Sequence, residues 1–190
     1  METQKRKNDA GFIKGVVTFT SFLIKGERAQ EIDSFLRTAE NIEPSLYESL
    51  VQELQGLCES KEIVRENLVV ATGRALVARM LIGDTTYTGA INYGALGTSS
   101  TAVSSGQTQL VAEVKRKLFA RRTRSSHQAS FDFYYSKNDT DGTYEEFGTF
   151  VDGTDTADSG QMFNRVLTAG WTKTDQEALT VSITFSVNES

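Results

Sequence analysis

The sequence predicts a mainly β protein: an antiparallel β-sandwich with an inserted helix pair and one further short helix. Three observations favour this class. Residues 12–24 and 179–187 have the composition of strands, and two stretches within 28–63 follow the helical period instead. After Gly83, short strand-like segments separated by turn clusters continue to the end of the chain. The 190 residues fit one domain, residues 1–190, and a chain of this size buries about 70% of its unfolded surface.

The first strand is expected at residues 12–24, where Val16 to Ile24 are β-branched, aromatic or hydroxyl-bearing and Lys25-Gly26 supplies a turn. A first helix follows, because apolar residues recur at the helical spacing: Ile32, Phe35, Leu36 and Ala39. Pro44 suits the first turn of a second helix. Its apolar face is predicted to contain Leu46, Tyr47, Leu50, Leu54, Leu57 and Cys58. We expect this pair, the 28–63 helical insertion, to cover the sandwich or to dock on a neighbouring chain.

Residues 67–70 are a short strand candidate, and a third helix is expected at about 72–82 with Gly83 as its stop. Its inward residues are predicted to be Leu76, Val77, Met80 and Leu81. The last strand has the clearest pattern, since apolar and hydroxyl residues alternate from Leu179 to Val187. Such alternation indicates one face on a core and one polar face. Five or six strands are expected after Gly83, with this one in a central position.

Composition excludes several classes of site. The chain holds one cysteine and one histidine, so it has neither an internal disulfide nor a Cys/His zinc cluster. A nucleophilic triad would rest on His127 alone. No segment approaches the ~20 apolar residues of a membrane helix, and the polar N-terminus lacks the apolar core of a secretory signal. We therefore expect synthesis in the cytoplasm, no membrane contact and no cofactor.

Two loops invite a binding interpretation. Gly94 to Gly106 is glycine-rich but lacks the Gly-Lys-Ser/Thr of a phosphate loop, which favours a strand followed by a loop. Residues 138–146 alternate oxygen-bearing side chains, as a calcium loop does. Positions one and twelve of such a loop would be Lys137 and Gly148, however, which favours a hairpin turn built on Asp141-Gly142. The sequence leaves calcium or glycan binding by residues 138–159 open.

Two segments of opposite charge stand out on a chain of net charge −5. Residues 115–124 contain six bases and no acid, whereas residues 138–159 contain seven acids and no base. We expect them to pair, within a subunit or between neighbours, in preference to binding nucleic acid. The residues predicted to form this interface are Lys115, Arg116, Lys117, Arg121, Arg122, Arg124, Asp139, Asp141, Asp152 and Asp155.

The order of short motifs resembles a class of small structural proteins of tailed bacteriophages, variously tail, tail-fibre or minor head components. The matching segments are the strand and turn Val16–Gly26, Asn67–Arg79, Tyr93–Thr98, Leu110–Arg116, Glu146–Phe150, Met162–Arg165 and Lys173–Val181. The glycine motif Gly94–Thr98 is one residue longer than in that class, and the helix pair is an addition. The resemblance implies a structural component of the virion.

The leading hypothesis is therefore a non-enzymatic virion protein, an oligomer of the tail, neck or capsid surface whose partners are copies of itself and other virion proteins. Nucleic acid is the disfavoured partner. The alternative is a receptor- or carbohydrate-binding module of a tail fibre. Its binding residues would be the tyrosines and aspartates expected in loops, namely Tyr134, Tyr135, Tyr144, Asp139 and Asp141. A wall-degrading enzyme is a third hypothesis, for which the sequence offers no catalytic residue or metal box.

Overall fold

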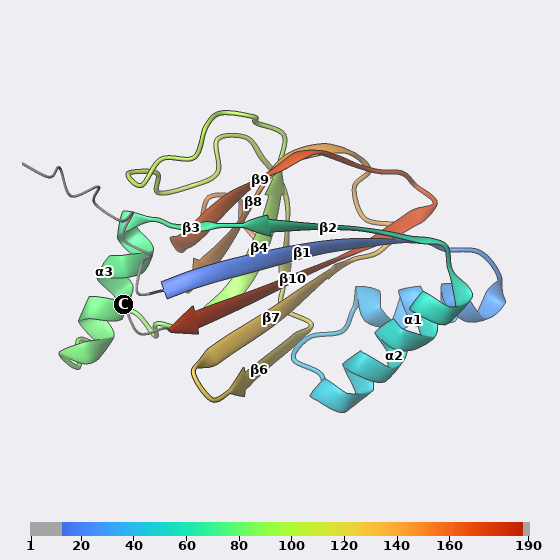
Figure 1. Cartoon of the computed structure of the whole chain (residues 1–190), viewed down its shortest axis with the longest axis horizontal. Coiled ribbons are helices and arrows are strands. Elements are labelled where there is room, and N and C mark those ends of the chain that lie inside the picture. The colour runs from blue at the N-terminus through green and yellow to red at the C-terminus, as the bar shows by residue number, and fades with distance from the viewer. Residues whose placement is uncertain (1–12, 188–190) are drawn as a thin grey trace, which may run out of the picture.

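The computed structural model describes residues 13–187, which form two five-stranded antiparallel sheets packed face to face (Figure 1). The first sheet has the strand order β2 (Ser60–Glu66), β1 (Ile13–Leu23), β10 (Glu177–Val187), β7 (Gln128–Tyr135) and β6 (Arg121–Ser125). The second has the order β3 (Leu68–Val69), β9 (Gln161–Lys173), β8 (Gly142–Val151), β4 (Ile91–Gly97) and β5 (Glu113–Leu118). The predicted mainly β sandwich is confirmed.

The last strand, β10, occupies the centre of the first sheet, as its sequence pattern predicts. It pairs with β1 along the whole of both strands, from Ile13 opposite Val187 to Leu23 opposite Glu177. Its odd-numbered residues from Leu179 to Phe185 are buried, while Ser182, Thr184 and Ser186 on the other face are partly exposed. The alternation holds because one face of β10 lines the core between the sheets.

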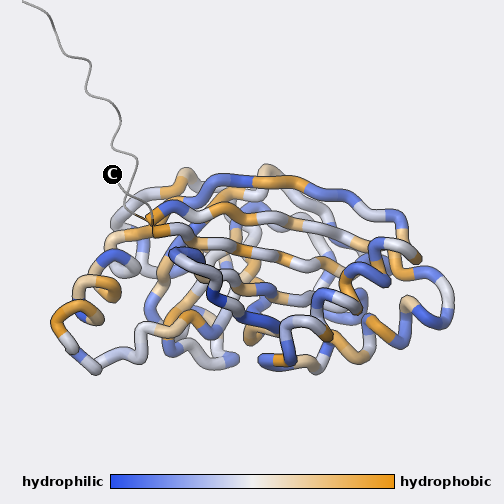
Figure 2. The backbone as a smooth tube through the Cα atoms, turned by 60° about the horizontal axis from the view of Figure 1, so that its bottom comes forward, coloured by the Kyte–Doolittle hydropathy of each residue, from blue (hydrophilic) through white to orange (hydrophobic). Residues whose placement is uncertain are grey.

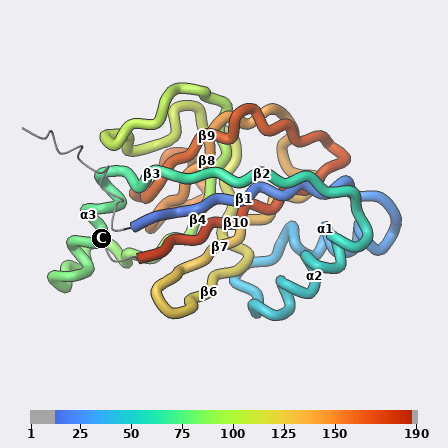
Figure 3. Tube along the Cα trace, in the orientation of Figure 1, coloured from blue at the N-terminus to red at the C-terminus, as the bar shows by residue number. Residues whose placement is uncertain are grey.

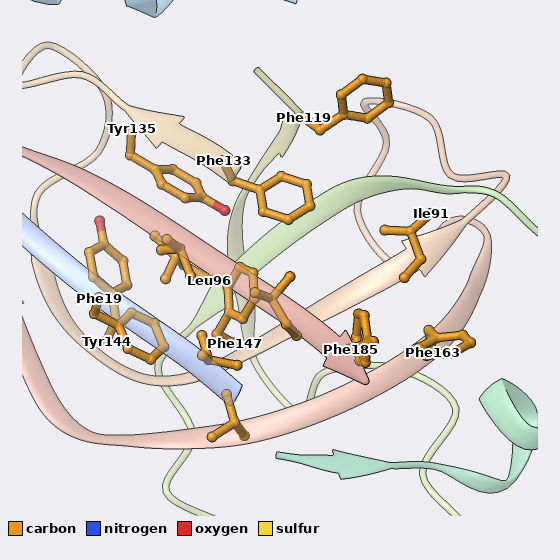
Figure 4. Packing of buried hydrophobic residues seen from close by; sticks show 14 of the residues in the cluster. Phe19, Ile91, Leu96, Phe119, Phe133, Tyr135, Tyr144, Phe147, Phe163 and Phe185 are labelled. Atoms are coloured by element: carbon orange, nitrogen blue, oxygen red, sulfur yellow. The ribbon is translucent and has the colours of Figure 1, made fainter. Parts of the chain in front are cut away.

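Aromatic rings from both sheets fill that core (Figure 4). Phe147 of the second sheet lies 5.8 Å, centroid to centroid, from both Phe19 and Phe133 of the first. Phe163 and Phe185 meet edge to face at 4.9 Å. Such pairs contribute about 0.5–1.5 kcal/mol beyond the burial of their area. The two sheets are therefore joined mainly by interlocking aromatic side chains.

The helix pair packs on the outer face of the first sheet, so it covers the sandwich itself. It consists of α1 (Glu27–Arg37) and α2 (Pro44–Leu57), and Pro44 is the first residue of α2, as expected. The Glu43 carboxylate caps α2 by accepting hydrogen bonds from the amides of Ser45 and Leu46. Apolar residues of the pair and of the sheet form one cluster: Phe22, Ile24, Ala29, Ile32, Leu36, Tyr47, Leu54, Ala120, Tyr134 and Ala178.

Several details of the helices differ from the sequence expectation. Residues 60–66 are strand β2, so the helical part of the 28–63 range ends at Leu57. Phe35 and Leu46, expected to face inward, are 48% and 44% exposed. Each helix touches the sheet along a stripe narrower than its apolar periodicity suggested. Within residues 13–187, seven strands follow the third helix, where five or six were expected.

The third helix, α3 (Ala71–Leu81), lies at the opposite end of the sandwich from α1 and α2 (Figures 1 and 3). It packs closely on β9 at Gly73, where an added Cβ would lie 2.2 Å from the Phe163 carbonyl oxygen. Leu76 is buried as expected, but Met80 and Leu81 are exposed because the helix runs past the edge of the sandwich. Gly83 ends the helix with a positive φ of 72°.

Two connections shape the surface. The acidic segment between β7 and β8 crosses from the first sheet to the second, so it is not the hairpin turn that Asp141-Gly142 suggested. The glycine-rich segment is indeed strand β4 followed by a loop, residues 98–112. An apolar cluster of Leu110, Phe150 and Met162, among others, packs this loop against the outer face of the second sheet. Within residues 13–187, none of the helices has the length and apolar character needed to cross a membrane.

Candidate functional site

The predicted pairing of basic and acidic segments occurs in part, and it occurs within one chain. Lys115 and Lys117 project from the same side of β5 towards Asp139, with Nζ–carboxylate distances of 3.4 and 3.3 Å. Asp139 also accepts a hydrogen bond from the Ser136 amide, and its side chain is almost completely enclosed. Lys117 Nζ additionally donates to the Arg37 carbonyl at the end of α1. These contacts tie the crossover loop and the end of α1 to the edge of the second sheet.

Arg116 points to the other side of β5, because successive side chains of a strand alternate. Its guanidinium forms a two-point ion pair with Glu113, at 2.6 and 2.7 Å. It also donates to the carbonyl oxygens of Thr154 and Ser159 and lies 4.8 Å from the ring centroid of Phe150. Arg116 is buried, and it holds the 152–160 loop against the second sheet.

Arg121 connects the first sheet to the helix pair. It forms ion pairs with Asp132 of β7 and with Glu48 of α2. The Asp132 carboxylate is buried and also accepts a hydrogen bond from Ser182 of β10. The guanidinium of Arg121 lies 5.5 Å from the ring centroid of Tyr47. Arg121 is thus an internal link between α2, β6 and β7, and its partners lie outside the acidic segment 138–159 with which it was predicted to pair.

The other predicted interface residues are not brought together. Arg122 is exposed, 4.8 Å from the ring centroid of Phe119, and Arg124 donates to the Ser126 carbonyl. Asp152 accepts a hydrogen bond from the Thr88 amide at 2.9 Å, while Asp141 and Asp155 are exposed. Within residues 13–187, no ion pair joins Arg121, Arg122 or Arg124 to any of these three aspartates.

The most deeply buried ion pair in the described residues was not predicted from the sequence. Glu146 of β8 and Arg165 of β9 are both fully buried, with Oε2 and Nε 2.6 Å apart. The Glu146 carboxylate also accepts hydrogen bonds from the amides of Val111 and Ala112, at 3.1 and 2.8 Å. Arg165 donates to the side-chain oxygen of Gln107 at 3.1 Å. The pair therefore fastens the 98–112 loop to the outer face of the second sheet.

A second buried carboxylate, Asp33 of α1, plays the same part on the first sheet. It accepts hydrogen bonds from the Tyr134 hydroxyl at 2.9 Å, the Ser136 hydroxyl at 2.7 Å and the Lys137 amide at 3.2 Å. Burial and then the nearby Asp33 charge raise the pKa of Tyr134 well above its usual range. Three donors from β7 and the residues after it thus hold α1 in place.

The tyrosines expected in ligand-binding loops lie elsewhere. Tyr134 and Tyr135 belong to β7 and Tyr144 to β8, and each of the three is 1% exposed. Their rings are therefore enclosed in the protein and are not available for stacking on a sugar. They were expected in loops because polar turn residues lie next to them in the sequence, between Tyr135 and Tyr144.

The acidic crossover loop does not gather its carboxylates around one point. Asp139 faces the two lysines, whereas Asp141 is exposed to solvent. In the described part of the chain, no three His, Cys, Asp or Glu side chains are grouped as metal ligands. In their observed arrangement, the buried carboxylates clamp surface segments to the sandwich.

Comparisons of the chain with protein-family models, with curated proteins and with solved structures find no match in any of the three. The function is therefore inferred from the residues of this chain and from their arrangement.

Proposed function

We propose that the chain is a non-enzymatic structural subunit of a bacteriophage virion, which contacts copies of itself and other virion proteins. The ordered motifs between Val16 and Val181 support this proposal by their resemblance to such proteins. The chain is synthesised in the host cytoplasm and is located in the virion.

The observation that carries the proposal is how the chain uses its buried charges. Glu146 with Arg165, Arg116 with Glu113, and Asp33 each hold a surface segment on the sandwich. The segments held are the 98–112 loop, the 152–160 loop and helix α1. A subunit of a large assembly needs such fixed surfaces, because ordering a loop at the moment of contact would weaken every copy of that contact.

Charged residues that remain exposed can form contacts with neighbouring subunits. Arg122 and Arg124 lie on β6, an edge strand of the first sheet, and Asp141 and Asp155 lie in loops. Opposite charges on neighbouring subunits determine the orientation and register of their contact more than its affinity. We therefore keep the predicted contact between subunits for these four exposed residues, and assign Lys115, Arg116, Lys117, Arg121 and Asp139 to internal links.

Deleting the gene from a phage that carries it tests this proposal. We expect infected cells to accumulate incomplete particles in electron micrographs, and expect the chain supplied from a plasmid to restore complete ones. Normal, infectious particles without the chain would overturn the proposal. Purified chain applied to a glycan array and to a gel containing bacterial wall separates the rival functions. Specific glycan binding would indicate a receptor-binding module, and clearing of the wall would indicate an enzyme.

A further inference from the structure

An apolar groove opens at the end of the sandwich that carries α3. Its volume is about 400 Å³, and strands of both sheets and α3 contribute to its walls. The apolar lining includes Ile13, Val77, Met80, Phe131, Phe163 and Phe185. Arg124 and His127, from β6 and the turn after it, stand among its few polar lining residues. An apolar recess of this size on a protein surface is typical of a binding site.

The end of α3, beside this groove, is the most exposed apolar feature of the described chain. Leu81 and Ile82 are 82% and 81% exposed, and Met80 is 55% exposed. Figure 2 shows this hydrophobic end projecting from the body of the molecule. The ion pair between Arg79 and Asp84 closes the turn behind it, and the Asp84 amide donates to the Arg79 carbonyl. The tip, residues 80–82, is therefore apolar, and the charges beside it are paired.

We infer that two copies of the chain exchange these tips, so that Leu81 and Ile82 of each copy occupy the groove of the other. The tip and the groove adjoin on the same helix: Val77 and Met80 line the groove, and Leu81 follows in the next position. A two-fold axis beside α3 therefore seats both tips at once, in a self-complementary contact. This inference rests on the self-association included in the proposed function and names the surface responsible.

The area available favours a two-fold exchange over a chain of single contacts. Tip and groove together offer roughly 500 Å² per copy, so an exchange buries about 1,000 Å² in total. That is the low end for a specific interface, whereas a single tip in a single groove would bury only about half as much, in the range of incidental packing. The exchange should therefore produce a dimer in rapid, concentration-dependent equilibrium with monomer.

Residues 1–12 are the rival occupant, because they lead into Ile13 at the wall of the groove. They contain Lys5, Arg6 and Lys7, which carry the same charge as Arg124 in the groove lining. Their only large apolar side chains are those of Met1 and Phe12. The apolar tip therefore matches the lining better than this basic segment does.

Sedimentation of the full chain over a range of concentrations tests the exchange. We expect a monomer–dimer equilibrium whose dissociation constant rises about 100-fold or more in the double variant Leu81→Asp, Ile82→Asp. Val64→Asp is the matched control, since Val64 is 51% exposed on β2 and should leave the equilibrium unchanged. A wild-type chain that stays monomeric, or a double variant that dimerises normally, would overturn the inference.

Cysteine cross-linking tests the same contact without disturbing it. In a Cys58→Ser background, chains carrying Ile82→Cys are mixed with chains carrying Ala129→Cys, a residue of the groove lining. We expect a mild oxidant to link the two kinds of chain far faster than either kind alone. No mixed disulfide, or rapid closure within a monomer carrying Phe12→Cys and Ala129→Cys, would refute the exchange.

The two proposals fail in different ways. A monomeric chain that is nevertheless needed for complete particles would refute the tip exchange alone. A chain that dimerises through Leu81 and Ile82 but is dispensable for the particle would refute the virion role alone.

Discussion

Glu146 and Arg165 form an ion pair that is sealed from solvent on neighbouring strands of the second sheet, and both side chains also bind the loop that covers them. The loop supplies two amides to the carboxylate and the Gln107 side chain to the guanidinium. The loop thus excludes water from the ion pair, and the ion pair in turn anchors the loop.

Replacing Glu146 with glutamine should therefore destabilise the protein strongly. The variant leaves the Arg165 charge buried without its counter-ion, which costs about 3–5 kcal/mol of unfolding free energy. Denaturation in urea, followed by tryptophan fluorescence, measures the change. Glu40→Gln is the control, because Glu40 is exposed and should change stability by less than about 0.5 kcal/mol. Equal stability of the two variants would show that the pair does not anchor the loop.

Charge reversal should reduce stability much more at Arg121 than at its sequence neighbour Arg122. Arg121→Glu places a like charge beside the buried Asp132, so we expect a loss of about 3 kcal/mol or more in unfolding free energy. Arg122→Glu removes only an exposed contact with the Phe119 ring and should cost about 1 kcal/mol or less. Thermal unfolding of the two variants checks the contrast. Similar melting temperatures would contradict the internal role assigned to Arg121.

Asp33→Asn should loosen the helix pair. Tyr134 and the Lys137 amide donate to one carboxylate oxygen of Asp33 and Ser136 donates to the other, so the NH₂ group of the variant faces one of these two sets of donors. Leaving one of them unpaired costs about 1–3 kcal/mol. Amide hydrogen exchange should accelerate first in α1 and α2, while β10 stays protected. Asp175→Asn, at an exposed position, is the control. Unchanged exchange in α1 would show that Asp33 does not hold the helix.

Alkaline pH should unfold the protein through its enclosed tyrosines. Burial raises the pKa of both Tyr134 and Tyr135 well above the usual range. Above the unfolded pKa of about 10, only the unfolded chain releases these protons, so stability falls by about 1.4 kcal/mol per pH unit for each tyrosine. Below that pH both states keep the protons and these groups cause no change.

Tyr135→Phe tests this pH dependence. The variant loses the hydrogen bond to the Gly94 carbonyl, which costs about 1 kcal/mol at pH 7. Its stability should then decline less steeply above pH 10, by about 1.4 kcal/mol per pH unit relative to wild type. Urea unfolding at several pH values measures both slopes. Parallel slopes would mean that Tyr135 does not titrate with unfolding.

The central strand β10 could be predicted from its side-chain pattern, and the edge strand β2 could not. The alternation of β10 survives in the sequence because every second residue faces the same apolar core. Strand β2 has only Ile63 and Val64 as apolar residues, and it is held by backbone pairing with β1, from Ser60 opposite Phe22 to Glu66 opposite Val16. Backbone pairing at an edge leaves little trace in the side-chain pattern, so residues 60–63 of this strand were assigned to the helical insertion.

The contacts that the charged side chains make likewise depend on how the strands are arranged. Lys115 and Lys117 reach Asp139 while Arg116 turns the opposite way, so a run of bases in the sequence becomes two separate contacts. Glu146 was counted among the acids of residues 138–159, and strand alternation alone would place it on the same face as Tyr144, which lies in the core. A shift in the β8–β9 register between these two residues places Glu146 on the outer face instead. Such a bulge is not visible in a single sequence.

Quantitative mass spectrometry of gradient-purified particles tests the central claim, that this chain is a structural part of a virion, most directly. The account predicts peptides of the chain in the particle band, at a fixed copy number relative to the major capsid protein that persists through a second gradient. A chain that is abundant in the infected lysate but absent from the particle band would contradict it.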